Sequence, residues 1–143
     1  MRIALAEAEA AAADDEVPVG AIVARGGTVL ARARNSPRRL CDPTAHAEIL
    51  ALREAARVEG SYRLTGADLI VTLEPCLMCV GAAVHARIGR IVFGAADPKA
   101  GATWILRHDW PGDARLNHAI AIVASIEEAA CGDLLRRFFA KRR

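Results

Sequence analysis

Two short segments of the sequence combine residue types that could hold a metal ion and move protons. The first contains His46 and Glu48, and the second is a Pro-Cys-x-x-Cys run with Pro75, Cys76 and Cys79. Cysteines three residues apart share one face of a helix, so both can contact the same ion. At a helix N-terminus the dipole also favours the thiolate, which is the form that binds metal. With the imidazole of His46 they would form a Cys₂His set, which suits zinc.

Three protein ligands leave the fourth tetrahedral position to water, which is typical of a catalytic zinc. Such a zinc lowers the pKa of its water to about 7, and Glu48 is the candidate for moving the protons. On an ideal helix, residues two apart point about 200° away from each other. His46 and Glu48 can therefore flank one ion only if His46 lies in an irregular entry turn. We expect Asp42 and Pro43 to start this helix, as N-cap and first helical residue, which places His46 in that turn.

Each part of the pattern has a simpler explanation by itself. The Cys76-x-x-Cys79 pair could be a thioredoxin-like redox pair, and a lone histidine is more often structural than a ligand. A structural zinc would need a fourth ligand, for which the remaining candidates are Cys41, Cys131, His85, His108 and His118. The joint pattern of His-x-Glu with Pro-Cys-x-x-Cys instead matches the signature of zinc nucleobase deaminases, in which the glutamate is the acid and base and not a ligand.

The elements that must position these residues alternate between helix and strand. An alanine-rich helix over 4–13 precedes a hairpin of strands 17–24 and 28–34, which turns at Gly26-Gly27. A loop over 35–43 leads to the His46 helix, which ends near Gly60. We expect a strand over 67–73, a helix from Pro75 to about residue 87, and strands over 90–94 and 119–124. A capping box over 125–128 then starts the last helix.

This order of elements predicts an α/β fold: a three-layer α/β/α domain over residues 1–143 with a mixed five-stranded central sheet. The chain of 143 residues is 53% hydrophobic and 25% charged, which is enough apolar material for one core and excludes disordered, collagen-like and disulfide-dependent classes. No apolar stretch approaches the ~18–20 residues of a membrane-spanning helix. We therefore expect a cytoplasmic protein, in which four cysteines favour a metal or redox site over disulfides.

The net charge of +2 is unevenly distributed. Five basic residues gather at the C-terminal end, at Arg136, Arg137, Lys141, Arg142 and Arg143, and the rest of the chain is slightly acidic. Such an asymmetry fits a polyanionic partner, or equally a solvated helix end that favours cations.

The motifs together resemble the bacterial tRNA-specific adenosine deaminases, within the cytidine-deaminase-like superfamily. The likeness covers nearly the whole chain and is carried by residues 17–21, 35–37, 42–48, 73–79, 81–82, 86–90, 92–95 and 138–139. The zinc motifs belong to the wider superfamily, and the whole pattern points to the tRNA branch.

The resemblance implies that His46, Cys76 and Cys79 hold one Zn²⁺ per subunit and that Glu48 shuttles protons. It also implies that Asn35 holds an edge of the purine, for which an amide that donates and accepts is apt; without the resemblance, a turn residue is an equal interpretation. The implied reaction is hydrolytic deamination of adenosine to inosine at the wobble position. The implied partners are a tRNA anticodon loop and a second copy of the chain.

The chain departs from the family pattern where RNA would be read. Ala96 precedes Asp97 where the family commonly has an arginine, and Trp104 and Trp110 stand in a stretch that is usually rich in small residues. Either tryptophan could stack on an unpaired base, although core or interface packing is the more common role. Candidates for phosphate contacts are Arg87, Arg90, Lys99 and the C-terminal cluster.

Two other functions remain open from the sequence. One is a zinc-dependent deaminase of a free nucleobase or nucleoside, such as guanine or cytosine. The other is a non-catalytic, zinc-stabilised RNA-binding subunit, against which Glu48 argues because a structural zinc needs no proton shuttle. For Cys41 and Cys131 we expect buried packing.

Overall fold

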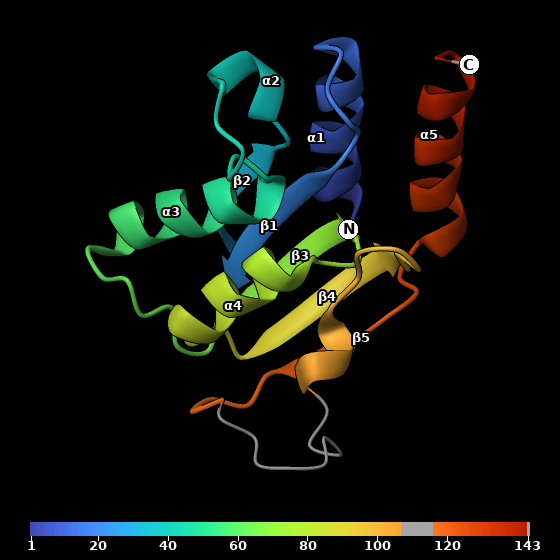
Figure 1. Ribbon diagram of the computed structural model, residues 1–143. Helices are drawn as coiled ribbons and strands as arrows, with labels where there is room; N and C mark the ends of the chain where they lie inside the picture. Colours follow the sequence, from blue (N-terminus) through green and yellow to red (C-terminus); the bar gives the residue numbers. More distant parts are fainter. Residues whose placement is uncertain (107–115, 143) are drawn as a thin grey trace.

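The computed structural model describes residues 1–106 and 116–142. The bounds of the helices and strands are α1 Arg2–Ala13, β1 Gly20–Arg25, β2 Thr28–Arg34, α2 Pro37–Leu40, α3 Ala47–Glu59, β3 Asp68–Leu73, α4 Leu77–His85, β4 Arg90–Ala95, the 3₁₀ helix η1 Thr103–Leu106, β5 Ala121–Val123 and α5 Glu128–Ala140. Helices and strands alternate along the chain after the β1–β2 hairpin and the helix pair α2–α3 (Figure 1). Among the described residues, no helix has both the length and the apolar character needed to cross a bilayer.

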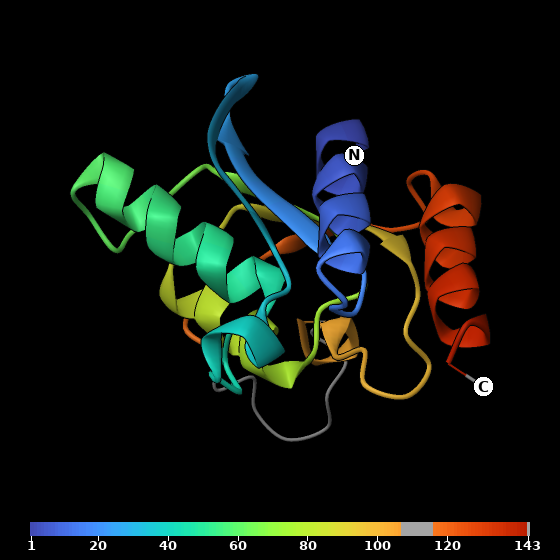
Figure 2. The ribbon, with the colours of Figure 1, turned by 90° about the horizontal axis from the view of Figure 1, so that it is seen from above.

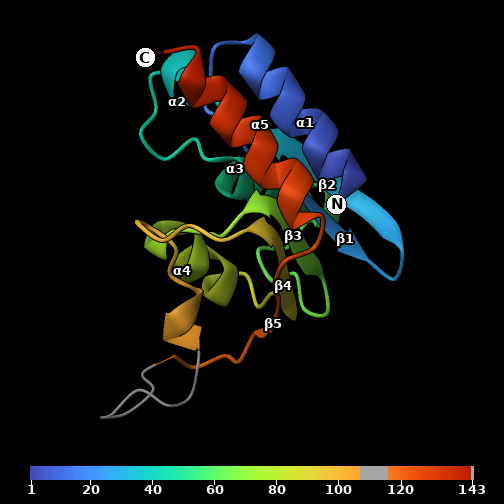
Figure 3. The same ribbon diagram turned by 90° about the vertical axis from the view of Figure 1, so that its right-hand side faces the viewer.

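The five strands form one mixed sheet in the order β2-β1-β3-β4-β5. Strand β1 is antiparallel to both β2 and β3, whereas β3, β4 and β5 run parallel. Helices α3 and α4 cover one face of the sheet, and α1 and α5 cover the other (Figures 2 and 3). This arrangement confirms the predicted three-layer fold with a mixed five-stranded sheet. It also places the starts of α3 and α4 on the same side of the sheet.

Helix α1 packs unusually close to the sheet through small residues. Ala4, Ala8 and Ala11 are fully buried, at the spacing that aligns residues on one helix face. Ala4 and Ala8 meet Gly20 at the start of β1, where an added Cβ would lie 2.0 Å from the carbonyl oxygen of Ala4 and 2.6 Å from the nitrogen of Ala8. The small side chains of α1 therefore allow its backbone to pack directly against the start of β1.

The helix that follows His46 begins later than we predicted. Helix α3 starts at Ala47 with His46 as its N-cap, in an extended conformation (φ −69°, ψ 151°). Asp42 does not cap it: its Oδ1 accepts hydrogen bonds from the Thr44 amide at 2.8 Å and the Thr44 hydroxyl at 2.7 Å. Such a bond to the residue two positions on forms an Asx turn, which competes with helix capping. The predicted end at Gly60 is confirmed, with φ at 64°.

The predicted capping box before the last helix is wrong. Helix α5 begins at Glu128 without a side-chain cap, and both Ser125 and Glu127 have left-handed backbone conformations. Between them, the Ile126 amide donates to the carbonyl oxygen of Phe93 at 3.2 Å. This contact with β4 fixes the path of the connection and prevents the regular helix entry that a capping box needs.

Three smaller differences concern the connections. The loop predicted over 35–43 contains the one-turn helix α2, which begins at Pro37 behind Ser36. The region after Pro98 contains η1. The strand predicted over 119–124 is shorter, Ala121–Val123.

Candidate metal centre and active site

Three predicted ligands from two helix N-termini come together in the structure. His46 is the N-cap of α3, Cys76 is the N-cap of α4, and Cys79 lies in the first turn of α4. The two Sγ atoms are 3.7 Å apart, and Nδ1 of His46 lies 3.7 Å from Cys76 Sγ and 3.6 Å from Cys79 Sγ. Both helices direct their positive dipole ends toward the group, which favours thiolate.

The size of this triangle fits a tetrahedral zinc. With Zn–S bonds of about 2.3 Å and Zn–N bonds of about 2.0–2.1 Å, two sulfurs are separated by about 3.8 Å and a sulfur and a nitrogen by about 3.6 Å. Among the described residues, the metal-binding group consists of His46, Cys76 and Cys79. The group therefore offers three ligand atoms at the right separations and leaves a fourth direction open.

The three predicted ligands shift one another's pKa values in different directions. Hydrogen bonds, first from Cys79 and then from His46, lower the pKa of Cys76 to about 3. The same contact with Cys76, together with burial, raises the pKa of Cys79. The hydrogen bond with Cys76 also raises the pKa of His46. These shifts favour the thiolate at Cys76 over the thiolate at Cys79, and they favour the protonated imidazole of His46.

Glu48 lies next to this group in the first turn of α3 and is only 4% exposed. Burial is the main cause that raises the pKa of its carboxyl, and the neighbouring His46 and Cys79 act in the opposite direction. Because His46 is extended and precedes the helix, His46 and Glu48 can face one centre, as the sequence required. A buried carboxyl beside metal ligands is suited to taking up and returning a proton.

Asn35 is buried at the end of β2, with its side chain directed to the start of α3. Its Oδ1 accepts a hydrogen bond of 3.1 Å from the amide of Ala47, the first residue of the helix. No described residue accepts a hydrogen bond from its Nδ2, which is also not sealed away from solvent. The side chain therefore has a structural contact beside His46 and still keeps a donor, so the two interpretations of Asn35 are compatible.

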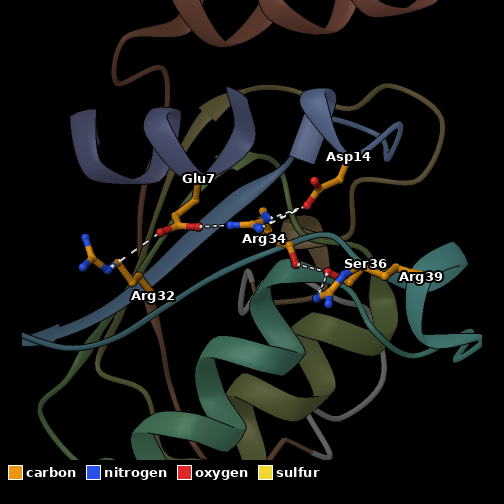
Figure 4. A network of polar contacts seen from close by, with 6 residues as sticks. All are labelled: Glu7, Asp14, Arg32, Arg34, Ser36 and Arg39. Atoms are coloured by element: carbon orange, nitrogen blue, oxygen red, sulfur yellow. Dashed lines mark hydrogen bonds and ion pairs between the residues drawn. The ribbon is translucent and has the colours of Figure 1, made fainter. Parts of the chain in front are cut away.

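An ionic network holds this corner of the molecule in place (Figure 4). Arg34, the residue before Asn35, contacts Glu7 at 3.4 Å and Asp14 at 3.1 Å, both on or next to α1. Ser36, the residue after it, donates from its hydroxyl to the carbonyl oxygen of Arg34 at 3.1 Å. Asn35 thus lies between Arg34, which is held by acidic groups on or next to α1, and Ser36, which bonds back to Arg34.

The sequence prediction missed Glu74, which precedes Pro75 at the end of β3. Its carboxylate accepts hydrogen bonds from the hydroxyl of Thr103 at 2.5 Å, the amide of Thr103 at 3.3 Å and the amide of Asp97 at 3.2 Å. The only signal in the sequence is its position two residues before a ligand. Its partners lie 23 and 29 residues further along the chain, where no spacing rule points to them.

The other cysteines and histidines of the described chain lie apart from the ligands. Cys41 is exposed, contrary to our prediction, because it ends α2, a one-turn helix none of whose residues is buried. Cys131 is buried as predicted, beneath Gly94, where an added Cβ would lie 2.3 Å from its Sγ. His85 is exposed, and Nε2 of His118 hydrogen bonds to the carbonyl oxygen of Ile88. His108 lies outside the described residues.

The candidate RNA contacts are divided between two ends of the sheet. Arg90 is paired with Asp68, and Arg87 donates to Asn117, both at the N-terminal ends of β3 and β4 and thus away from Cys76. Lys99 is exposed in the loop after β4. Trp104 in η1 is 47% exposed, and Trp110 lies outside the described residues.

Part of the C-terminal basic cluster is engaged within the protein. Arg136 pairs with Asp133. Arg142 pairs with Asp15 and lies over the ring of Phe138, and Asp15 also pairs with Arg38 of α2. Arg143 lies outside the described residues.

Comparisons with known proteins agree with this geometry. Residues 1–95 match the family described as the cytidine and deoxycytidylate deaminase zinc-binding region. A tRNA-specific adenosine deaminase of Agrobacterium fabrum is 44% identical over 100% of this chain and 93% of its own length. A solved structure from work on A-to-I editing by tRNA deaminases at the wobble position has a TM-score of 0.87 and 42% identity, covering 94% of this chain and 97% of that one. A guanine deaminase from Nitrosomonas europaea has a TM-score of 0.80 at 25% identity, covering 96% and 81%.

Proposed function

Because the chain belongs to the family of tRNA-specific adenosine deaminases, we propose that it deaminates adenosine to inosine, by hydrolysis, at the wobble position of a tRNA anticodon. The observation that carries this proposal is the triangle of His46, Cys76 and Cys79, whose sides of 3.6–3.7 Å fit zinc, with the buried carboxyl of Glu48 beside it. A structural zinc has no use for such a carboxyl, which argues against a non-catalytic subunit.

In this proposal each side chain has one task. His46, Cys76 and Cys79 hold the zinc, which supplies an activated water when bound. Glu48 takes a proton from that water, gives it to a ring nitrogen of the adenine, and later assists the departure of ammonia. Its raised pKa suits both directions of transfer. Asn35 binds an edge of the purine through its Nδ2, because its Oδ1 is already used by Ala47.

The target base must leave the anticodon loop to reach this site, since a stacked base would not meet the buried carboxyl. The loop after β4 and α5 then offer the side chains that could contact the RNA around it. With a tRNA substrate we expect the enzyme to act in the cytoplasm, and we expect residues 1–143 to act as one deaminase domain.

We further propose that two copies of the chain associate. The supporting observation lies at the start of α4, where the apolar side chain of Leu77 is 59% exposed. Beside it is a depression of about 330 Å³ lined by Thr44, Ile49, Leu52, Arg53, Met78 and Ala82. Light scattering after gel filtration would give twice the mass of the chain. An Ala82→Arg variant, which fills the depression with charge, should shift that mass toward one chain.

The activity is tested with zinc-loaded protein and an unmodified tRNA that carries adenosine at the wobble position. Free adenosine, guanine and cytidine are incubated in parallel, and the products are identified by mass spectrometry. A Glu48→Ala variant is the control, and its zinc content is measured to show that the metal site is intact.

Inosine in the tRNA, formed only when Glu48 is present, is the expected result. Turnover of guanine with the tRNA untouched would overturn the proposal in favour of a free-base deaminase, for which the likeness to guanine deaminases provides a precedent. A Glu48→Ala variant as active as the parent would contradict the role given to that residue.

A further inference from the structure

A half-buried carboxylate connects the metal site to the loop that follows β4. Glu74 lies two residues before Cys76. Its Oε1 accepts hydrogen bonds from both the hydroxyl and the amide of Thr103, and its Oε2 accepts one from the amide of Asp97. These bonds anchor the two ends of the 97–103 loop to one side chain. A charged acceptor makes each of them stronger than a bond between neutral groups.

Backbone contacts complete the attachment of the 97–103 loop. Cys76 forms an isolated antiparallel bridge with Gly101, and the amide of Ala102 donates to the carbonyl oxygen of Pro75 at 2.9 Å. An added Cβ on Gly101 would lie 2.4 Å from the carboxyl carbon of Glu74. Glycine is therefore required at 101 because the Glu74 carboxylate occupies the space beside it.

This loop carries the groups best suited to single-stranded RNA near the site. Lys99 is exposed and forms no ion pair within the described residues. Trp104 follows Thr103 directly and is 47% exposed. A cation and an aromatic side chain are the two groups with which proteins hold unpaired nucleotides, through phosphate contact and stacking.

We propose that Glu74 is a positioning residue, which fixes the 97–103 loop and η1 beside Cys76 and so sets the affinity for the nucleotides that flank the target base. This inference rests on the proposed activity on tRNA. Glu74 does not belong to the ligand group and does not take part in proton transfer. Its removal should therefore weaken RNA binding while zinc and the proton shuttle remain.

The test is Glu74→Gln, which keeps the shape of the side chain. Its oxygen can still accept from Thr103, but its NH₂ group would face the amide of Asp97, so two donors oppose each other. We expect KM for tRNA to rise about tenfold, the change that corresponds to about 1.4 kcal/mol, with kcat changed less than about threefold. Zinc stoichiometry should stay the same.

Two further variants separate positioning from simple loss of stability. Gly101→Ala leaves Glu74 in the chain and displaces its carboxylate, so it should reproduce the rise in KM. Glu54→Gln makes the same chemical change at an exposed carboxylate paired with Arg57 on the outside of α3, and it should leave KM unaltered.

A binding measurement gives a second readout that needs no turnover. In a Glu48→Ala background, the Kd for a fluorescent anticodon stem-loop is compared with and without Glu74→Gln, and a parallel increase in Kd is expected. If both KM and Kd stay within twofold of the parent for Glu74→Gln, the inference is overturned while the proposed function stands. If the parent protein neither binds nor edits the RNA, the proposed function fails, and the RNA role of Glu74 fails with it.

Discussion

The polar groups at the two ends of the parallel strands β3 and β4 differ in exposure and in pairing. At the N-terminal end, Arg90 and Asp68 form an exposed ion pair with a 2.5 Å contact, and Arg87 is bonded to Asn117. At the C-terminal end, Cys76 follows β3 and meets His46, and the buried carboxyl of Glu48 forms no ion pair within the described residues.

Charges that neutralise each other at the surface cost little to hold and contribute little stability. A buried carboxyl beside a thiolate is costly, and such groups mark sites where protons or ligands are handled. The polar residues at one end of the strands are neutralised by ion pairs, whereas those at the other end are buried without such pairs. Four predictions test whether this difference separates structural from functional residues.

The largest effect is expected from Glu48→Gln, which keeps the size of the side chain and removes its ability to carry a proton. Inosine formation under single-turnover conditions should fall by about 10²–10⁴-fold, the usual contribution of a general acid–base group. The melting temperature should not fall, because burial disfavours the charged form of the carboxyl in the native protein. A variant with more than a tenth of the parent rate would place the proton shuttle elsewhere.

The second prediction concerns zinc affinity and pH. The pKa values of His46 and Cys79 are both raised, and both groups must be deprotonated to bind zinc. Apparent affinity should therefore rise with pH, by up to about tenfold per pH unit for each proton released. Chelator competition between pH 6 and 8 measures the slope, and calorimetry in two buffers counts the protons.

The matched control for zinc binding is Cys41→Ser, the same exchange as Cys76→Ser but at an exposed thiol. Cys76→Ser should lower zinc content, and Cys41→Ser should not. An affinity independent of pH would mean that the ligands are already deprotonated in the metal-free protein.

A smaller and more selective effect is expected at Asn35. Asn35→Asp keeps an oxygen that can accept from the amide of Ala47, but a second oxygen replaces the Nδ2 donor. Asn35→Ala removes both the acceptor oxygen and the donor. Asn35→Ala should lower the free energy of unfolding by about 1 kcal/mol, measured by urea denaturation, and both variants should raise KM. If Asn35→Asp bound substrate as well as the parent, the residue would serve only to hold α3.

The smallest effect is expected at the N-terminal end of the strands. Arg90→Ala removes the exposed ion pair with Asp68 and should leave kcat/KM for tRNA unchanged, with little change in the melting temperature. Lys99→Ala, the same loss of charge beside the site, should raise KM and reduce the salt dependence of binding. Equal effects of the two variants would remove the distinction between the two ends.

The success of the sequence prediction depended on how far apart the interacting residues lie. Cys76 and Cys79 are three apart, so their shared helix face could be predicted from spacing. The prediction for His46 had the correct result, an irregular position before the helix, but the wrong cause, because Asp42 bonds to Thr44 instead of capping. Glu74 could not be predicted, since its acceptor role depends on where the chain returns after β4.

The capping box failed for a related reason. Ser125 has the right spacing from Glu128, and in an isolated peptide that spacing would favour helix entry. In the folded protein the hydrogen bond from the Ile126 amide to the carbonyl oxygen of Phe93 fixes the backbone of the connection between β5 and α5. Local signals predicted the elements and the ligands, whereas the contacts between distant segments determined how the elements begin and what surrounds the site.

The close packing of α1 against Gly20 has a consequence for the tolerance of the chain to change. Ala4, Ala8 and Ala11 are fully buried, while Ala6 and Ala13 on the same helix are exposed. Identical residues in one short segment are therefore under opposite constraints. In a library of all single substitutions in α1, the fraction of substitutions that leave the protein folded should therefore vary along the chain with the period of the helix.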